Sequence, residues 1–479
     1  MSARKVAVVG GGLGGLTAAG ELARQGVEVT LFEATAQLGG KAGFLEHAGT
    51  RLDIGPTLVA MPDTVRAAFE RLGASDLLPQ FREVALQCAY RFSDGARFSV
   101  SRSSEETFAS ARTFGASEEA GLRSFYGEAS TIALAAGEPY LEAGFEGLGT
   151  FALRVARRGW KALWAGAQMG TLAGLAARHV KSPQLQQFIG RFATYAGASP
   201  YQASAAFALI PHLEQAHGIF HPVGGAGALV QAAATAVQRL GVRAVLNARA
   251  HWRREGRGWV VGPEGGGEVF DAVVVNADPL AHIGRGDEPV ALSGYVALFE
   301  SQVPLALPHH SVGFSADYRA EFNSLFRGQV PDDLTVYLCH PSVTDSTMSE
   351  PGKSGLYVMV NAPALAHAGA SDDALPQLRE GARRALKKHF PEVDRTGLRL
   401  IAERTPGDLE LLGAPRGSIY GFLPHGLMGP FRRPRIRAKE SNFYFAGGGT
   451  HPGGGLPMVM LSGRFAAQCA LEDFARARA

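Results

Sequence analysis

Three glycines near the start of the chain stand at fixed spacing between an apolar run and a helical pattern. Gly10, Gly12 and Gly15 form a G-x-G-x-x-G series after Lys5–Val9, which is typical of a buried parallel strand. Gly10 permits a tight turn, Gly12 lets a pyrophosphate approach the backbone, and Gly15 lets the following helix pack close to the sheet. That helix, predicted over Leu13–Gln25, directs its positive end at the phosphates. These residue types therefore indicate dinucleotide binding.

A carboxylate follows at the end of the next predicted strand. Val27–Phe32 has the apolar pattern of a second buried strand, and Glu33 comes directly after it. A carboxylate at that place accepts hydrogen bonds from both hydroxyls of an adenosine ribose and disfavours a 2′-phosphate, which argues against NADP. Strand, turn, helix and acid together favour a dinucleotide site over the alternative, a glycine-rich turn that binds no ligand.

Two further motifs favour FAD over NAD. Gly39-Gly40-Lys41 and Asp53-Ile54-Gly55-Pro56-Thr57 come soon after Glu33. This arrangement resembles the glutathione-reductase-type FAD proteins, in the branch that holds amine oxidases and carotenoid desaturases. In that branch the paired glycines and the basic residue border the cofactor, and the Asp-x-Gly-Pro turn lies beside the flavin ring. For Asp53, a chemical role and a turn-capping role are both open.

A second glycine-rich segment follows near residue 450. Asn442–Ala446 predicts a last buried strand and Gly447–Gly455 predicts a loop. The residues from Leu456 onward predict a helix with Pro457 in its first turn. A helix that starts at the flavin stabilises the negative charge of the reduced ring. Amine oxidases carry an acid where Gly448 stands here, and this departure weakens an amine oxidase function.

The run Thr450–Gly455, THPGGG, resembles the hallmark of bacterial phytoene-desaturase-type enzymes, and the resemblance covers nearly the whole chain. Residues 191–200 and 457–464 are similar to the 1-hydroxycarotenoid 3,4-desaturase (methoxyneurosporene dehydrogenase) branch. The resemblance implies an FAD-dependent oxidoreductase that acts on CH–CH groups. It would introduce a C=C bond into an acyclic, 1-hydroxylated carotenoid by hydride transfer to flavin. Phytoene or another carotene is the alternative substrate, and a non-redox lipid-escort protein of the GDP-dissociation-inhibitor kind is the alternative from another class.

The motifs and the resemblance together mark the residues that contact FAD. They are Gly10, Gly12, Leu13, Gly14, Gly15, Glu33, Ala34, Gly40, Lys41, Gly55, Pro56, Thr57, Ala250, Asn276, Gly448, Gly449, Leu456, Pro457 and Met458. No acid or base stands out, because a polyene can itself delocalise the cationic character of the reaction. Asp53, Tyr195 and His451 are the catalytic candidates. Packing is the alternative role for His451 and Tyr195, and Tyr195 or Thr194 could bind a substrate hydroxyl.

The order of the predicted elements indicates an α/β protein whose FAD-binding domain is interrupted. Tyr90–Val100 predicts a hairpin, and residues 104–180 are mostly helical. Short strands within 295–360 fit an antiparallel sheet that walls a substrate cavity. We predict a Rossmann-type, glutathione-reductase-like FAD-binding domain, an antiparallel-sheet substrate domain and a helical insertion. The FAD-binding parts are 1–75, 215–285 and 421–479, and the substrate domain comprises 76–214, with the insertion, and 286–420.

Composition limits the possible partners. A net charge of +3 over 479 residues is too small for nucleic acid binding. Three widely spaced cysteines, Cys88, Cys339 and Cys469, predict neither a disulfide framework nor a metal site. The sequence shows no second motif for a pyridine nucleotide, so oxygen or a quinone is the expected electron acceptor.

One basic, tryptophan-containing segment bears on location. Residues 151–180 place Trp160 and Trp164 beside several arginines and a lysine. Such a helix suits an anionic membrane surface, whereas the alternative is a surface helix that packs its tryptophans inward. No apolar stretch reaches membrane-spanning length. We expect a cytoplasmic protein, and the membrane-binding alternative for this segment would place it peripherally on the inner face of the cytoplasmic membrane.

Overall fold

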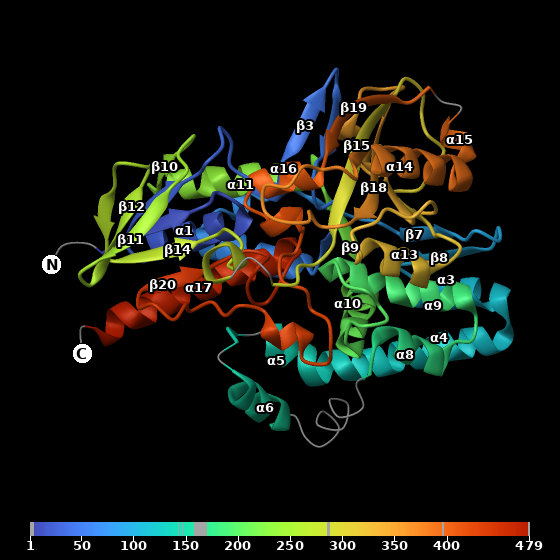
Figure 1. The fold of residues 1–479 in the computed structure, drawn as a ribbon, viewed down its shortest axis with the longest axis horizontal. Coiled ribbons are helices and arrows are strands. Elements are labelled where there is room, and N and C mark those ends of the chain that lie inside the picture. Colours follow the sequence, from blue (N-terminus) through green and yellow to red (C-terminus); the bar gives the residue numbers. More distant parts are fainter. Residues whose placement is uncertain are drawn as a thin grey trace.

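The structure is a computed structural model that describes residues 4–141, 143–145, 147–157, 170–284, 288–394 and 397–477. Figure 1 shows a parallel sheet beside both ends of the chain, a second, larger sheet on the opposite side, and a layer of helices along the larger sheet. The predicted α/β class, with a Rossmann-type nucleotide-binding part and a second sheet, is confirmed.

A five-stranded parallel sheet forms the nucleotide-binding part. Its strands in spatial order are β10 (Arg243–Val245), β2 (Glu28–Phe32), β1 (Lys5–Val9), β14 (Ala272–Val275) and β20 (Phe443–Phe445). Val8 of the central strand β1 pairs with Leu31 on one side and with Val274 on the other. Because both faces of β1 are covered, its sequence is a continuous apolar run and not an alternating pattern.

One strand of this sheet is shorter than the sequence pattern indicates. Residues 241–250 predict a strand, but only Arg243–Val245 pairs with β2. Asn247 has a φ of 53° and its N–H donates to the Thr35 carbonyl, so the chain turns away from the sheet there. The turn brings Ala250 to the edge of the nucleotide-binding part.

The two faces of the parallel sheet pack against different layers. Val6 and Val8 face a helical layer, and Ala7 between them faces the opposite side. The helical layer consists of α1 (Leu13–Arg24), α2 (Pro62–Leu72), α11 (Gly225–Arg239) and α17 (Leu456–Arg476). The opposite layer is an antiparallel sheet of β11 (His251–Glu255), β12 (Gly258–Gly262) and β13 (Glu268–Phe270). Trp259 and Phe270 of this small sheet fill the interface, which the sequence pattern did not predict.

A seven-stranded sheet forms the second part of the molecule. Its strands in order are β19 (Arg399–Arg404), β15 (Ser293–Ser301), β18 (Ser354–Ala362), β17 (Val336–Cys339), β16 (His310–Gly313), β7 (Leu86–Arg91) and β8 (Arg97–Ser101). The predicted antiparallel pairing is confirmed for β15, β17 and β18, whereas β16 and β7 are parallel, with Val312 opposite Tyr90. A parallel pair needs a long crossover, and residues 92–309, which include the helical insertion and a large part of the nucleotide-binding unit, separate the two strands.

Helices cover the larger sheet on two sides. Against its core pack α13 (Tyr318–Leu325), α14 (Leu375–His389) and α15 (Pro391–Asp394). The helical insertion contains α3 (Ser104–Ala111), α4 (Ala116–Ile132), α5 (Glu138–Leu141), α6 (Leu148–Ala156), α8 (Leu172–His179), α9 (Pro183–Gly190) and α10 (Leu209–His217). Phe188 of α9 contacts Tyr90 of β7, with ring centroids 5.2 Å apart. Trp160 and Trp164 lie outside the described residues, and among the described helices none is both long and apolar enough to cross a bilayer.

Short elements connect the two large sheets. They are the hairpin β3 (Phe44–His47) and β4 (Thr50–Asp53), the sheet of β5 (Val59–Ala60), β9 (Ile219–Pro222) and β6 (Phe81–Glu83), and the helices α12 (Leu280–Ile283) and α16 (Pro406–Leu411). Leu52 of β4 packs against Val296 and Leu298 of the larger sheet. This contact fixes the hairpin between the nucleotide-binding part and the seven-stranded sheet.

Asp53, at the end of β4, binds the start of α11. Its two carboxylate oxygens accept the N–H groups of Ala226 and Gly227, each at 2.9 Å. Gly224, the residue before the helix, has no side chain that could accept these N–H groups. Asp53 therefore caps α11 from a distant part of the chain. The carboxyl group is buried, and burial raises its pKa from 3.8 to about 6 against the opposing effect of these two hydrogen bonds.

The raised pKa of Asp53 predicts a pH-dependent stability. Because the folded-state pKa lies above the unfolded value, the contribution of Asp53 to stability is greatest below pH 4 and is lost as the pH rises through about 6. Asp53→Asn removes this titration, so the wild-type thermal midpoint should fall relative to that of the variant between pH 4 and 7. Asp63→Asn, at an exposed position in the first turn of α2, is the control and should show no such trend. Parallel curves for wild type and Asp53→Asn would contradict the assignment.

Candidate functional site

A cavity of about 1270 Å³ lies between the parallel sheet and the seven-stranded sheet. At one end its walls are the glycine-rich turns that follow β1, β14 and β20, at the carboxyl ends of the parallel strands, where open α/β sheets bind ligands. At the other end the walls are mostly apolar side chains of the larger sheet and the helical insertion. Small-molecule pockets usually measure about 300–1,000 Å³, so this cavity has room for a second ligand beside a nucleotide.

The residues predicted to contact FAD come together around this cavity. Those that line it are Gly10, Gly12, Leu13, Gly14, Glu33, Ala34, Gly40, Lys41, Gly55, Pro56, Thr57, Ala250, Asn276, Gly448, Gly449, Leu456, Pro457 and Met458. Gly15 departs from this prediction, because it does not line the cavity. A Cβ at Gly15 would lie 2.1 Å from the Gly10 carbonyl oxygen, so this glycine serves the close packing of α1 against the turn.

The start of α1 suits a pyrophosphate. Gly12 precedes the helix in an extended conformation (φ −69°, ψ 169°), and no side chain accepts the N–H groups of the first turn. Gly12, Leu13 and Gly14 all line the cavity, so these N–H groups and the positive end of the helix are available to an anion. A Cβ at Gly14 would lie 2.7 Å from Asn276 Oδ1 and 3.0 Å from the nitrogen of Gly447, so the protein itself requires glycine there.

Glu33 has a second role that the sequence pattern did not reveal. Its Oε2 accepts the N–H of Gly11 at 2.7 Å, and its Oε1 accepts the N–H of Thr35 at 2.9 Å and the Thr35 hydroxyl at 2.8 Å. The carboxylate therefore holds the glycine turn in place from the end of β2. Each oxygen can accept more than one hydrogen bond, so recognition of a ribose at this edge is compatible with these contacts.

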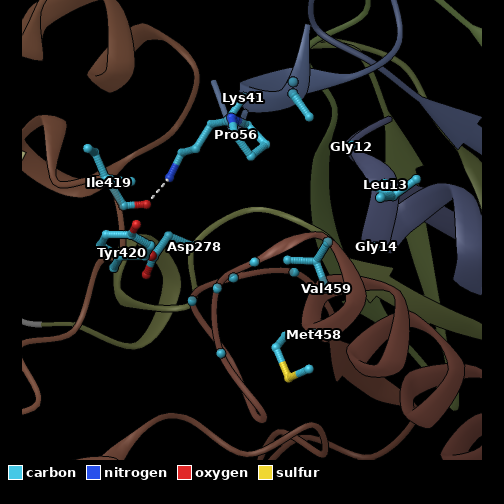
Figure 2. A pocket seen from close by; sticks show the side chains of 18 of the residues that line it. Gly12, Leu13, Gly14, Lys41, Pro56, Asp278, Ile419, Tyr420, Met458 and Val459 are labelled. Carbon is cyan, nitrogen blue, oxygen red and sulfur yellow. Dashed lines mark hydrogen bonds between the residues drawn. The ribbon is translucent and has the colours of Figure 1, made fainter. Parts of the chain in front are cut away.

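The start of α17 borders the same cavity. Gly455, with a φ of 103°, precedes the helix, and no side chain caps its first turn. Leu456, Pro457 and Met458 line the cavity, so a second uncapped helix directs its positive end there. Figure 2 shows the two helix starts, at Leu13 and Met458, around one space. This arrangement favours a group that gains negative charge on reduction, as a flavin does.

Three charged side chains line the cavity near the glycine-rich turns that follow β1 and β20. Lys41 Nζ donates to the carbonyl oxygen of Ile419 at 2.8 Å (Figure 2). Arg433 Nη1 donates to the carbonyl oxygen of Gly448 at 2.6 Å and so holds the loop Gly447–Gly455. Asp278 lies on the same side of the cavity, two residues beyond Asn276 at the end of β14.

Burial shifts the pKa of all three groups. It lowers the pKa of Lys41, an effect that the attraction of Asp278 opposes. It raises the pKa of Asp278, which Lys41 and Arg433 oppose, and it lowers the pKa of the Arg433 guanidinium. The sequence pattern identified Lys41 but missed the other two. The position of Asp278 after the buried strand could have indicated it, whereas the loop that carries Arg433 has no motif.

The structure separates the three catalytic candidates. Tyr195 lines the cavity, and its hydroxyl donates to Glu214 Oε1 at 2.7 Å. Asp53 does not line it, because both of its carboxylate oxygens are bound to the start of α11. His451 does not line it either, because its ring is 1% exposed and packs 4.4 Å from the ring of Tyr140. In the structure Asp53 caps a helix and His451 packs against an aromatic ring, and neither residue lines the cavity.

The fold and the cavity define an oxidoreductase of the FAD-binding type. A family model described as flavin containing amine oxidoreductase matches residues 13–283, and the chain belongs to this family. It is 32% identical to a hydroxyneurosporene desaturase of Cereibacter sphaeroides, over 98% of both chains. It is 30% identical to a carotenoid 3,4-desaturase of Haloarcula japonica, over 99% of both chains.

Solved structures agree in fold. A putrescine oxidase superposes with a TM-score of 0.66 at 17% identity, covering 98% of this chain and 99% of that one. At this identity the likeness concerns the fold alone, and Gly448 stands where amine oxidases carry an acid. The match to an oxidoreductase family favours redox chemistry over the lipid-escort alternative.

A side chain at Gly12 should abolish FAD binding. Its Cβ would lie 2.7 Å from the Asn276 amide nitrogen, at the cavity wall where the uncapped N–H groups lie. We expect Gly12→Val to be purified without flavin, as measured by the absorption ratio at flavin and protein wavelengths after gel filtration. Gly127→Val is the matched control, because a Cβ at Gly127 meets nothing within 4 Å, and it should keep stoichiometric FAD. Stoichiometric FAD in Gly12→Val would show that the pyrophosphate binds elsewhere.

Proposed function

We propose that this protein is an FAD-dependent carotenoid desaturase that introduces a C=C bond into an acyclic carotenoid, with a 1-hydroxylated carotenoid as the preferred substrate. The observation that carries the proposal is the continuity of one cavity from the nucleotide-binding turns into an apolar region. Side chains of that region include Ile132, Phe207, Leu213, Val296 and Met359. A long hydrocarbon would bury its surface there, which is favourable by about 25 cal/mol for each Å² removed from water.

The chain's own residues would bind, orient and shield the polyene. Bound FAD would supply the hydride acceptor. Apolar walls exclude water, and the two uncapped helix starts and Lys41 place positive potential at the nucleotide-binding end. The C=C bond forms when the carbon next to the one that gives up the hydride loses a proton, and because the conjugated chain delocalises the positive charge, a weak proton acceptor suffices. The absence of Asp53 and His451 from the cavity is consistent with this mechanism.

The names of two relatives support the substrate class. One relative acts on hydroxyneurosporene, and the other is named for desaturation of a carotenoid at the 3,4 position. Phytoene is the alternative substrate within the same class. For reoxidation we propose oxygen or a quinone, because the sequence has no second nucleotide motif.

We also propose that the protein binds the membrane surface through α6 and the loop before Phe431. The ring of Phe431 lies 4.9 Å from that of Phe151 on α6, and both residues line the cavity. Exposed apolar side chains flank this aromatic pair: Leu148 (50% exposed) and Leu153 (54%) on α6, and Leu427 (53%) and Met428 (40%) on the loop. Apolar side chains around a cavity wall would let a carotenoid pass from lipid into the protein.

Desaturation is tested with the FAD-loaded protein and two polyenes in liposomes, a 1-hydroxylated acyclic carotenoid and phytoene. A new C=C bond lengthens the conjugated system, so the absorption of the extracted lipid should shift to longer wavelength. We expect the shift with the hydroxylated substrate. A shift with phytoene alone would move the protein to the general desaturases, and no shift with either, under oxygen or with an added quinone, would refute the proposal.

Membrane binding is tested by flotation with anionic liposomes. Leu148→Asp combined with Leu153→Asp puts two charges on the proposed contact, so the floated fraction should fall several-fold. Val343→Asp is the control, because Val343 is similarly exposed (56%) but follows β17 in the larger sheet, and it should float like the wild type. Equal flotation of all three proteins would contradict this surface, whatever the result of the desaturation assay.

A further inference from the structure

A group of polar side chains lies in the apolar region of the cavity. Arg191, Tyr195 and Glu214 all line the cavity there. The Tyr195 hydroxyl accepts a hydrogen bond from Arg191 Nη2 at 3.4 Å and donates one to Glu214 Oε1 at 2.7 Å. Arg191 Nη1 donates to the Tyr90 hydroxyl at 3.1 Å. The cation and the carboxylate are thus joined through a hydroxyl, with aromatic rings on several sides of the guanidinium.

Glu214 is the most buried member of this group. It lies on α10, where its neighbours at the cavity, Leu209, Ile210 and Leu213, are apolar, and it is only 9% exposed. Burial raises the pKa of its carboxyl group, against the opposing influence of Arg191 and the hydrogen bond from Tyr195. Its second oxygen, Oε2, has no hydrogen-bond partner among the described residues. Because Glu214 lines the cavity and Oε2 is not fully buried, this oxygen can accept a hydrogen bond from a ligand in the cavity.

The stability of the fold does not explain why Arg191 and Glu214 lie in an apolar region. A buried ionic group often stabilises a protein less than well-packed apolar residues of the same volume would. The group lies where an apolar ligand would bind, and it offers both a donor, Arg191, and an acceptor, Glu214. A hydrocarbon alone would offer no hydrogen bond to Glu214 Oε2 and would displace water from it. A hydroxyl group, which donates one hydrogen bond and accepts others, satisfies the donor and the acceptor together.

We propose that Arg191, Tyr195 and Glu214 form the site that recognises an oxygen-bearing end of the substrate, with an alcohol hydroxyl donating to Glu214 Oε2. This inference rests on the proposed desaturase function and extends it, because it assigns the substrate's polar end to one place in the cavity. The reacting CH–CH group would then lie toward the nucleotide-binding turns. A site built to hydrogen-bond a hydroxyl rejects the analogue that lacks it, here by about 10- to 100-fold in kcat/KM.

Paired substrates test this recognition. Two acyclic polyenes of the same chain length, one with a terminal hydroxyl and one without, are compared in liposomes with wild type, Tyr195→Phe and Glu214→Met. Each variant replaces a polar group by an apolar one of similar size. Both should lower kcat/KM for the hydroxylated polyene and leave that for the hydrocarbon unchanged or raised. Tyr201→Phe is the matched control, because it removes a tyrosine hydroxyl that does not line the cavity, and it should keep the wild-type preference.

Equilibrium binding keeps the test independent of turnover. Quenching of protein fluorescence by each polyene gives the two dissociation constants, and FAD content and thermal midpoint show that each variant is folded. A wild-type preference for the hydroxylated polyene that disappears in either variant supports the proposal, even if neither polyene is desaturated and the desaturase function fails. An unchanged preference in both variants, or an equal loss for both polyenes, would overturn the recognition site while leaving the desaturase function in place.

Discussion

A close contact between two helices holds the nucleotide-binding end of the cavity together. A Cβ at Gly463 of α17 would lie 2.2 Å from the carbonyl oxygen of Gly14 in α1, so only glycine allows the helices to approach this far. Gly14 in turn meets Asn276 after β14 and Gly447 after β20. Three distant chain segments therefore join at one residue without a side chain. The uncapped starts of both helices face the same space because this contact places them side by side.

Charged side chains around the cavity stabilise its loops through main-chain atoms. Glu33 accepts the N–H of Gly11, Lys41 donates to the carbonyl of Ile419, and Arg433 donates to the carbonyl of Gly448. Each of these contacts joins segments that are separate in the sequence. Because the partners are neutral peptide groups, the side chains satisfy their hydrogen bonds without having their charge cancelled. The charges of Lys41 and Arg433 therefore contribute to the electrostatic potential in the cavity while their hydrogen bonds hold its loops.

The sequence predicted the parts of the site that depend on backbone geometry. Glycine spacing and apolar runs are local signals, so the turns after β1 and β20 and the strands themselves could be recognised. Asp53 and His451 were misleading because the same residue types cap helices and pack in cores. Asp278 and Arg433 were missed because only the tertiary structure brings them to the cavity. The sheet of β11, β12 and β13 and the parallel pairing of β16 with β7 were not predicted, since strand partners are long-range contacts without a local pattern.

The position of β20 in the parallel sheet has a consequence for protein synthesis. β20 pairs with β14, and the turn and helix start that follow it supply a whole wall of the cavity. On the ribosome these residues emerge after all other residues that line the cavity, so a nascent chain can form β1, β2 and β14 long before it can enclose a nucleotide. Until then the nucleotide-binding end of the cavity lacks this wall. Enclosure of a nucleotide is therefore a late event in synthesis, and a chain that ends before β20 lacks a wall of the site.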